Sequence, residues 1–499
     1  MPHLKKRLAD IIPIESTLDC DITGLSQDSR RLKAGDLFFA YAGLQADGRD
    51  FIQEALDKGA AAVLVEPGPT FPAAKVPIIP IDQLSSQLSE IAARFYDHPA
   101  QALKLVGITG SNGKTSCTHF IAACLEAAGQ PCGLIGGLGN GRYAQRYGPT
   151  STQQHQHPQL TTPDAIELQA LLADFRDQGI STVAIEVSSH RLAQGRLTGI
   201  PFTIAGFTNL DYDHLDYHGT MAAYAAAKRR LFASAQHAVL NRDDPIGAQW
   251  QTELSNQLPV YTYALSPPPL NQATRLDCHA TLINPNSVGL STELYSPWGV
   301  GYLHNAQLIG QFNLSNLLLV VTVLGILGLP LAESLTHIAH LQPVLGRMTR
   351  FGGGSQPLVI VDYAHTPDAL QKTLEALRPY TSGQLYCIFG CGGDRDRRKR
   401  PLMGAVAEHY ADKVIMTADN PRYEDIDQIV QDMLVGIKDP KRVIIELDRQ
   451  RAIVSTIAAA KTGDVVLIAG KGHTAYQLIG DTQLPFSDQE EVRKALAYV

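Results

Sequence analysis

The chain has 499 residues, 44% of them hydrophobic, and carries a formal net charge of −7. One hydrophobic core rarely supports this length, so we expect two to four domains. The acidic balance argues against a general nucleic-acid binder, because neutralising a phosphate backbone requires a basic surface. The seven cysteines are an odd number and widely scattered, which favours reduced thiols in a cytoplasmic protein over a disulfide framework.

Neither a signal peptide nor a membrane span is expected. The first ten residues lack the apolar core of a signal peptide. The longest apolar run, Leu314 to Leu331, contains Ser315, Asn316 and Thr322 and ends in glycine and proline. It therefore predicts a buried helix and its end.

Breakers and motif spacing divide the chain into three regions. Residues 1–99 alternate short apolar runs with turns, which predicts a small α/β domain without a catalytic signature. Residues 100–341 repeat strand and helix patterns, which predicts a central parallel sheet of the P-loop ATPase kind. Residues 342–499 predict a doubly wound, Rossmann-like α/β domain, because each of four apolar runs is followed by glycine, proline or a helical stretch. Those runs are 358–362, 384–389, 413–417 and 464–469.

The most informative stretch is Gly107-Ile-Thr-Gly-Ser-Asn-Gly-Lys-Thr115, directly after a strand-like run. In a phosphate-binding loop, glycines let backbone N–H groups surround the phosphates, lysine reaches the terminal phosphates and threonine holds magnesium. The usual first glycine is replaced by Ile108. A chance Gly-Lys-Thr is the alternative, but the helical pattern that follows favours an ATP site. Its expected contacts are Gly110, Ser111, Asn112, Gly113, Lys114, Thr115 and Ser116.

Two further strand-like runs end in polar residues. Thr182–Glu186 ends in a carboxylate, which could face magnesium because ligands of open α/β sheets lie at the carboxyl ends of the strands. Residues 204–209 lead into 210–219, which contain three aspartates and two histidines. We interpret this cluster as a metal and nucleotide site in preference to a solvated acidic turn.

Two other segments allow alternative interpretations. Residues 389–401 place glycines after a strand and then five basic residues, which indicates an anion site at a helix start or a solvated basic helix. The low-complexity stretch 151–159 contains His155 and His157, and a flexible loop is favoured there over a metal site.

Several blocks in order resemble the Mur ligase family. They are Thr109-Gly-Ser-Asn-Gly-Lys-Thr115, Glu186-Val-Ser-Ser-His190, residues 209–218, Asn241-Arg-Asp-Asp244, residues 310–316, Gly346-Arg-Met348 and Asp362-Tyr-Ala-His-Thr-Pro-Asp368. The match runs nearly the whole chain. Three features are similar to the members that add the third residue of the peptidoglycan stem peptide: residues 25–30, Gln194-Gly-Arg196 and Asp419-Asn-Pro-Arg422.

The resemblance implies an ATP-dependent amide ligase that forms an acyl phosphate, which an amine then attacks. The implied catalytic residues are Lys114, Lys228, His214 and Arg347, and the implied magnesium ligands are Thr115, Glu186, His214 and Lys228. Lys228 stands where the family carries a carbamylated lysine, and the alternative is a plain surface lysine on an alanine-rich helix. Asn313 and His365 are implied at adenine, Asp362 at ribose and Arg347 at the phosphates.

The implied acceptor is UDP-N-acetylmuramoyl-L-alanyl-D-glutamate. Its implied contacts are Ser29 and Arg30 at the uridine end, and Thr161, Thr162, Ser188, Gln194 and Arg196 at the muramoyl-dipeptide. The implied amino acid is meso-diaminopimelate, contacted by Arg395, Asp419, Asn420, Pro421, Arg422, Gly470 and Thr474. We expect a cytoplasmic monomer that binds no nucleic acid and does not insert into a membrane.

One departure keeps the amino acid open. Thr474 stands where diaminopimelate-adding members typically have a glutamate for the far ammonium, so Asp488 or Glu490 compensates, or that end is held differently. Three functions remain: a diaminopimelate ligase, a sister ligase that adds lysine or another amine, and a P-loop NTPase that drives conformational or transport work. A non-catalytic UDP-sugar sensor is disfavoured because the phosphate and metal ligands look intact.

Overall fold

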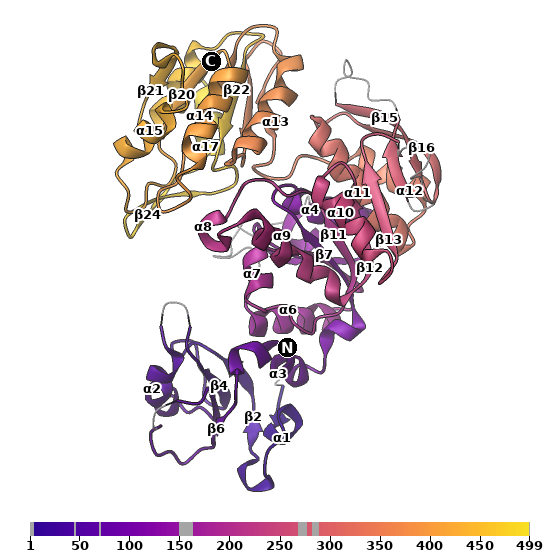
Figure 1. Cartoon of the computed structure of the whole chain (residues 1–499), viewed down its shortest axis with the longest axis vertical. Coiled ribbons are helices and arrows are strands. Elements are labelled where there is room, and N and C mark those ends of the chain that lie inside the picture. Colours follow the sequence, from indigo (N-terminus) through magenta and orange to yellow (C-terminus); the bar gives the residue numbers. More distant parts are fainter. Residues whose placement is uncertain are drawn as a thin grey trace. The chain divides into compact units, whose positions relative to one another are not determined.

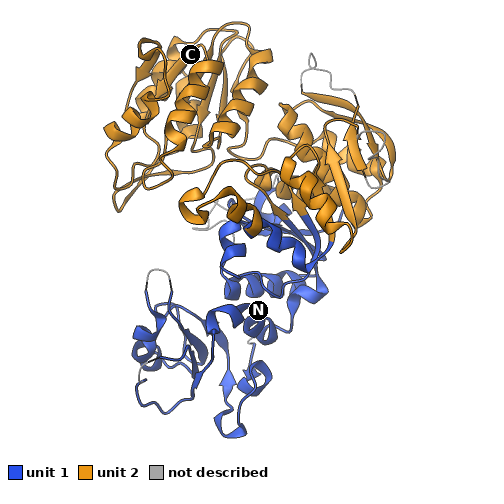
Figure 2. Ribbon diagram, viewed as in Figure 1, with its two compact units in different colours: residues 1–107, 129–205, 227–236 blue, residues 108–128, 206–226, 237–499 orange. Residues whose placement is uncertain are grey.

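The computed structural model describes residues 4–43, 46–68, 71–148, 163–267, 277–281 and 289–498. By contacts between Cα atoms, the chain forms two compact units (Figure 2). The first contains residues 1–107, 129–205 and 227–236, and the second contains residues 108–128, 206–226 and 237–499. Both units therefore combine segments that lie far apart in the sequence.

The N-terminal part of the first unit is a small parallel sheet with helices (Figure 1). Its strands follow the order β3 (Gly24–Ser26), β4 (Asp36–Ala40), β5 (Ala62–Val65) and β6 (Ile78–Pro80). Every residue of β4 and β5 is buried. Helix α3 (Leu84–Phe95) places Leu84, Leu88, Ile91 and Phe95 on one face, the spacing of an amphipathic helix, and all four join the core. The remaining elements are α1 (Leu8–Ile11), α2 (Ile52–Asp57) and the pair β1 (Lys6–Arg7) and β2 (Asp21–Ile22).

The rest of the first unit is built on five strands in the order β11-β7-β10-β8-β9. They are β11 (Phe202–Phe207), β7 (Lys104–Thr109), β10 (Thr182–Glu186), β8 (Cys132–Gly136) and β9 (Gly139–Arg142). Strands β8 and β10 pair in parallel, whereas β9 is an antiparallel edge. The accompanying helices are α5 (Tyr143–Tyr147), α6 (Ala165–Asp177) and α7 (Ser189–Ala193). Helix α6 packs against α3.

The second unit begins with α4 (Lys114–Ala127), which follows the phosphate-loop residues. Its strands β12 (Ala235–Asn241), β13 (Val260–Ala264) and β14 (Asp277–Ala280) pair in parallel, and β15 (Leu290–Ser296) and β16 (Gly299–Asn305) add an antiparallel hairpin. Helix α11 (Gln311–Leu327) packs on α4 and is apolar on nearly all sides because it is almost wholly buried. The remaining helices are α8 (Leu215–His218), α9 (Met221–Arg229), α10 (Pro245–Leu254) and α12 (Leu331–Ala339).

The C-terminal part is a three-layer sandwich around a six-stranded sheet of order β17-β18-β22-β19-β20-β21. These strands are β17 (Thr349–Gly352), β18 (Leu358–Asp362), β22 (Val465–Ala469), β19 (Leu385–Phe389), β20 (Lys413–Met416) and β21 (Val443–Ile445), and only β17 is antiparallel. Strand side chains alternate between faces. One face meets α13 (Pro367–Leu377), α14 (Lys399–Tyr410) and α15 (Ile426–Leu434), and the other meets α16 (Arg449–Ala459) and α17 (Asp488–Leu496). A hairpin, β23 (Tyr476–Ile479) and β24 (Thr482–Pro485), stands outside this sheet.

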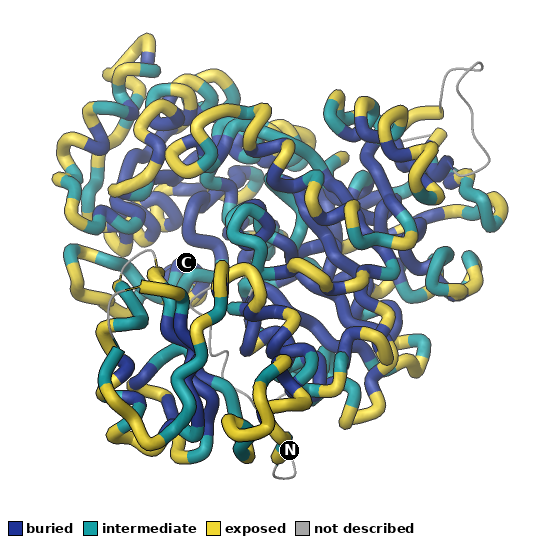
Figure 3. The backbone as a smooth tube through the Cα atoms, turned by 60° about the horizontal axis from the view of Figure 1, so that its bottom comes forward, coloured by how far each residue is buried: buried dark blue, intermediate teal, exposed yellow. Residues whose placement is uncertain are grey.

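These elements confirm the predicted three-domain α/β fold, with mostly parallel sheets. The four apolar runs of the third region match β18, β19, β20 and β22, and most residues of these strands are buried. Buried stretches of the backbone lie mainly in the interior, and exposed stretches lie mainly at the periphery (Figure 3). The run from Leu314 is the buried helix α11, which ends at Gly328 in a left-handed conformation (φ 96°). Within the part of the chain that the structure describes, no helix is long and apolar enough to cross a membrane.

Candidate functional site

The predicted phosphate loop lies between the end of β7 and the start of α4. Gly110 and Gly113 have φ of 148° and 88°, and a Cβ on Gly110 would lie 1.8 Å from Thr208 Oγ1. Only glycine fits this approach. Lys114 Nζ donates to the carbonyl oxygens of Gly110 (2.9 Å) and Ser111 (2.8 Å), so its ammonium lies over the loop.

Residues that follow β11 brace this loop from the side. Asn209 accepts hydrogen bonds from Ser111 N at its backbone oxygen (2.8 Å) and from Asn112 N at its side chain (2.9 Å). Asp211 Oδ2 accepts from Asn112 Nδ2 (3.0 Å). The backbone N–H groups of Ser111 and Asn112 are therefore fixed by a segment about a hundred residues further along the chain.

Asp211 belongs to a group of charged residues beside the loop. Burial, and then the Asp368 carboxyl, raises the pKa of Asp211 to about 7 against the opposing charge of Lys372. Lys372 Nζ in turn lies 2.7 Å from Asp368 Oδ2, one turn away on α13. A carboxyl whose pKa is raised toward neutrality beside the predicted phosphate loop is a candidate for function.

A cavity of about 730 Å³ opens next to these residues, entirely within the second unit. Six of the expected ATP residues line it: Asn112, Gly113, Ser116, Asn313, Arg347 and Asp362. Its volume is in the range of small-molecule and cofactor sites. Lys114, Thr115 and His365 are not among its lining residues.

At the edge of this cavity, Arg347 contacts two side chains, and Asp362 fixes the backbone. Arg347 Nη2 donates to Thr115 Oγ1 (3.0 Å), and its guanidinium lies 4.2 Å from the centre of the Tyr363 ring. Asp362 accepts from Met348 N (2.7 Å) and Ala364 N (2.8 Å), and its burial raises the pKa of this carboxyl.

Two histidines share one buried carboxylate. Asp213 Oδ2 lies 3.3 Å from His214 Nε2 and 3.7 Å from His365 Nε2. Burial alone would raise the pKa of Asp213, but the hydrogen bond to His365 and the charges of His365, His214 and Lys399 bring the pKa well below its usual range. The acidic loop is thus a structured charged cluster, and the interpretation as a solvated turn is wrong for Asp213, which is only 7% exposed.

Glu186 and Lys228 are both buried in the described structure. Glu186, at the end of β10, is 2% exposed and accepts a hydrogen bond from Gly137 N (3.1 Å). Lys228, on α9, is 1% exposed, so the alternative of a plain surface lysine is wrong. Burying a lysine is costly unless it is paired, neutralised or modified.

The residues predicted to contact the UDP-linked acceptor substrate belong to the first unit. Ser29 is buried and donates to Glu54 Oε2 (2.9 Å), whereas Arg30 is largely exposed and pairs with Asp28 (2.8 Å). Ser188 is the N-cap residue of α7, and Gln194 is its C-cap residue. Burial raises the pKa of the Tyr41 phenol, and the nearby positive charge of Arg196 partly offsets this rise. Thr161 and Thr162, like His155 and His157, lie outside the described residues.

The residues predicted to contact the amino-acid substrate come together at the carboxyl ends of three neighbouring strands, β19, β20 and β22. Arg422 has φ of 53° and donates from Nη1 to Gly393 O (2.6 Å), which brings its loop onto that of Arg395. Burial, and after it the positive charge of Arg395, lowers the pKa of Arg422. Two nearby guanidinium groups have the charge and the donors that suit binding of carboxylates.

A buried lysine holds the Asp-Asn-Pro-Arg segment from the β22 side. Lys471 Nζ donates to Asn420 Oδ1 (3.0 Å) and Asp419 Oδ1 (3.4 Å), and burial lowers its pKa. Thr474 N donates to Lys471 O (2.8 Å), and Gly470 N donates to Asp362 O (3.1 Å). Gly393 lies directly against this segment, because a Cβ on Gly393 would be 1.8 Å from Pro421 O.

Asp488 does not replace the glutamate missing at position 474. It is 0% exposed, and its two oxygens each lie 2.7 Å from Arg449 nitrogens. Arg449 is also buried and donates to Ala418 O and Ala469 O, so this ion pair supports the ends of β20 and β22 from behind. Glu490 is exposed in the first turn of α17.

The sequence predictions missed several residues of these sites. Asp211, Asp368 and Lys372 stand inside or next to quoted blocks, but their spacing along the chain does not bring them together. Arg400 lies within the basic stretch 389–401, whereas Glu424 and Lys471 fall outside the predicted site residues. For Glu424, its place two residues after Arg422 was the available signal.

Comparisons with known proteins identify the class that this fold and these sites define. Three family models match: "Mur ligase family, catalytic domain" over residues 21–96, "Mur ligase middle domain" over 108–324 and "Mur ligase, glutamate ligase domain" over 346–472. The chain therefore belongs to the Mur ligase family, and it is an ATP-dependent ligase that forms carbon–nitrogen bonds.

Particular relatives share one name. A protein of Coxiella burnetii named UDP-N-acetylmuramoyl-L-alanyl-D-glutamate–2,6-diaminopimelate ligase is 47% identical over 96% of each chain. A Pseudomonas putida protein of the same name is 46% identical over 95% of each. A solved structure of a ligase with that name is 35% identical, covers 99% of each chain and superimposes with a TM-score of 0.68. The MurF ligase of Thermotoga maritima in complex with ADP shares the fold at 19% identity, with a TM-score of 0.65 over 97% of this chain and 99% of that one.

Proposed function

We propose that this protein joins meso-diaminopimelate to UDP-N-acetylmuramoyl-L-alanyl-D-glutamate, using ATP, in the synthesis of peptidoglycan precursors. The observation that carries this proposal is the pair Arg395 and Arg422 on adjoining loops of the C-terminal sheet. Diaminopimelate carries two carboxylates and two amines, so a site with two guanidinium groups suits it better than it suits lysine. Relatives of this name at 46–47% identity over nearly the full length support the same assignment.

In this reaction, the protein mainly positions the substrates and stabilises negative charge. Joining an amine to a carboxylate in water is uphill, so the γ-phosphate of ATP is first transferred to the carboxylate of the acceptor. The neutral amine then attacks the acyl phosphate, forming the amide bond and releasing inorganic phosphate. Lys114 and Arg347 stabilise negative charge on the transferring phosphoryl group, as in other phosphoryl transfers.

The same proposal assigns residues to ATP and to the acceptor substrate. Asn313 and His365 hold the adenine side, and Asp362 holds the ribose. Ser29 and Arg30 contact the uridine end of the acceptor. Thr161, Thr162, Ser188, Gln194 and Arg196 contact its muramoyl-dipeptide.

Magnesium is the proposed ion, held by Thr115, Glu186, His214 and a carbamylated Lys228. Thr115 offers a hydroxyl, Glu186 a carboxylate and carbamylated Lys228 a carbamate, which are oxygen donors of the kind that this hard cation prefers, and His214 would add a nitrogen donor. The burial of Glu186 and Lys228 suits an ion-binding role. When bound, magnesium neutralises charge on the phosphates. Because UDP-linked precursors and ATP are cytoplasmic substrates, we propose a cytoplasmic location.

A ligase that adds lysine is the second candidate, because Thr474 replaces the expected glutamate and Asp488 is bound to Arg449. The decisive experiment measures phosphate release with ATP, UDP-N-acetylmuramoyl-L-alanyl-D-glutamate and each amino acid in turn. We expect release with meso-diaminopimelate to exceed that with lysine by orders of magnitude. Preference for lysine would overturn the amino-acid assignment. ATP turnover without the muramoyl acceptor would favour an NTPase instead.

A further inference from the structure

The two arginine-bearing loops, residues 390–398 after β19 and 418–425 after β20, are joined by direct backbone contacts. Gly393 N donates to Asn420 O (2.9 Å), and Tyr423 N donates to Asp394 Oδ2 (3.2 Å). Asp394 and Arg422 have φ of 51° and 53°, a region that residues other than glycine seldom adopt. Surrounding contacts must therefore impose the conformation of both loops.

Glu424 joins the same two loops through its side chain. Its Oε1 accepts a hydrogen bond from Asp394 N (2.6 Å), although Glu424 itself follows Arg422 by two residues. Its Oε2 lies 2.9 Å from Arg397 Nη2. Glu424 N also donates to Pro421 O (3.1 Å), which tightens the turn that carries Arg422.

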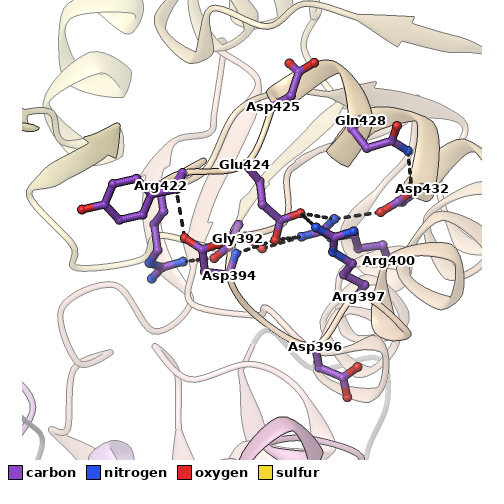
Figure 4. Close-up of polar contacts among 12 residues, drawn as sticks. Gly392, Asp394, Asp396, Arg397, Arg400, Arg422, Glu424, Asp425, Gln428 and Asp432 are labelled. Carbon is purple, nitrogen blue, oxygen red and sulfur yellow. Dashed lines mark hydrogen bonds and ion pairs between the residues drawn. The ribbon is translucent and has the colours of Figure 1, made fainter. Parts of the chain in front are cut away.

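Arg400 holds Glu424 in place from the start of α14. Its guanidinium is 0% exposed and bonds to both carboxylate oxygens of Glu424 at 3.0 Å (Figure 4). Nη2 also donates to Gly392 O (3.2 Å), and Nη1 also donates to Asp432 Oδ2 (2.8 Å). The two hydrogen bonds from Arg400 are the leading reason that the pKa of Glu424 is lowered, so the carboxylate stays charged. A bidentate, charge-assisted contact of this kind is strongly directional.

We propose that Arg400 and Glu424 are positioning residues that set where Arg395 and Arg422 stand, and thereby determine selection of the amino-acid substrate. This inference rests on the proposed role of Arg395 and Arg422 in binding that substrate. Neither Arg400 nor Glu424 lines the nucleotide cavity. Their effect is therefore confined to the amino acid.

The test replaces Glu424 with glutamine, which keeps the shape and removes the charge. We expect Glu424→Gln to raise KM for meso-diaminopimelate by roughly ten- to a hundredfold, the usual effect of losing a partner that orients a ligand-binding group. The KM values for ATP and for UDP-N-acetylmuramoyl-L-alanyl-D-glutamate should not change. Arg400→Lys, which keeps the charge and loses the bidentate contact, should act in the same direction and provides a second variant should the first fold poorly.

Glu408→Gln is the matched control. Glu408 lies on α14 and, like Glu424, accepts backbone N–H donors with its carboxylate, here from Lys438 (2.9 Å) and Asp439 (2.8 Å), neither of which belongs to the two loops. It should change melting temperature at most and leave every KM value intact. An equal rise for all three substrates in Glu424→Gln, or the same rise in Glu408→Gln, would mean that Glu424 has only a structural role.

A double-mutant cycle with Arg422→Ala tests whether Glu424 acts through Arg422. In that background, Glu424→Gln should change the KM for meso-diaminopimelate by less than about twofold, since residues in one network are not additive. Full additivity would overturn the inference. The wild type is first assayed with a panel of amino acids. This assay distinguishes failure of the inference about Glu424 from failure of the proposed function. If another amino acid proves to be the substrate, the same cycle is measured with it and judged by the same outcomes.

Discussion

At the scale of single residues, the charged side chains that we propose for function differ in burial. Lys228 is 1% exposed and Glu186 2%, whereas Arg30, in the turn after β3, keeps most of its side chain in water. A charged group in the interior requires a compensating partner or modification. Buried Lys228 therefore needs a partner or a modification, and carbamylation is the modification that we propose.

Carbamylation of Lys228 is directly testable. Lys228→Ala should be inactive, and short carboxylates such as acetate or formate should partly restore activity, because they return an anion to the vacated position. The measurements are phosphate release with all three substrates and the mass of the native wild-type protein. Detection of free amine alone in fully active enzyme would exclude the modification.

The raised pKa of Asp211 predicts that this carboxyl makes a pH-dependent contribution to stability. Its pKa is raised from 3.8 to about 7, so between these values the folded protein keeps a proton that the unfolded chain has lost. The contribution of this carboxyl is therefore greatest at low pH and falls as the pH rises toward 7. Asparagine imitates the protonated form, so the melting temperature of Asp211→Asn relative to wild type should rise between about pH 4 and pH 7 and then level off. A difference that stays constant across this range would mean that Asp211 is ionised throughout.

At the scale of elements, function is concentrated in loops that follow parallel strands. The carboxyl ends of β19, β20 and β22 supply the two arginines, the Asp-Asn-Pro-Arg segment and Lys471. Arg449 and Asp488 fix the backbone behind them, so these loops are supported on two sides by buried arginines, Arg400 and Arg449. Positions held by such support vary little, which suits selection between similar amino acids.

Arg422 is the residue of these loops that we expect to discriminate diaminopimelate from lysine. Loss of one charge-assisted contact in a largely desolvated pocket costs about 2–5 kcal/mol. Arg422→Ala should therefore lose turnover of meso-diaminopimelate by orders of magnitude, whereas any turnover of lysine should hardly fall. The comparison is kcat/KM for both amino acids in both proteins. Equal losses would assign Arg422 a structural role.

At the scale of the whole molecule, the cavity that we propose for ATP combines segments from residue 112 to residue 380 within the second compact unit. Strands and helices of the central region provide one wall, and β18 and α13 provide another. A ligand that binds only this folded arrangement stabilises all of its parts at once.

Nucleotide binding should therefore raise the melting temperature, and Lys114→Ala should weaken that response. A non-hydrolysable ATP analogue at a hundred times its Kd contributes about 2.7 kcal/mol to stability. Lys114→Ala should also abolish turnover, since contacts to a transferring phosphate contribute several kcal/mol to the transition state. Thermal scans with and without analogue, together with phosphate release, check both effects. Near-normal release by a folded Lys114→Ala protein would remove Lys114 from the mechanism.

The sequence by itself determined the local features of this protein. The alternation of apolar runs and helices specified β7, β10 and the strands of the C-terminal sheet, because strand and helix periodicity are local properties. The phosphate loop was also predictable, since its glycines and lysine act within a few residues of one another.

Only the tertiary structure decided which distant side chains meet. Asp211 and Asp368, or Arg400 and Glu424, are separated by tens to hundreds of residues, and no periodicity encodes their contact. The same holds for Asp488, whose sequence position suggested a substrate contact but whose carboxylate is bound to buried Arg449. Chain packing determines which charges are desolvated and which partners they find, and desolvation sets their energies and pKa values.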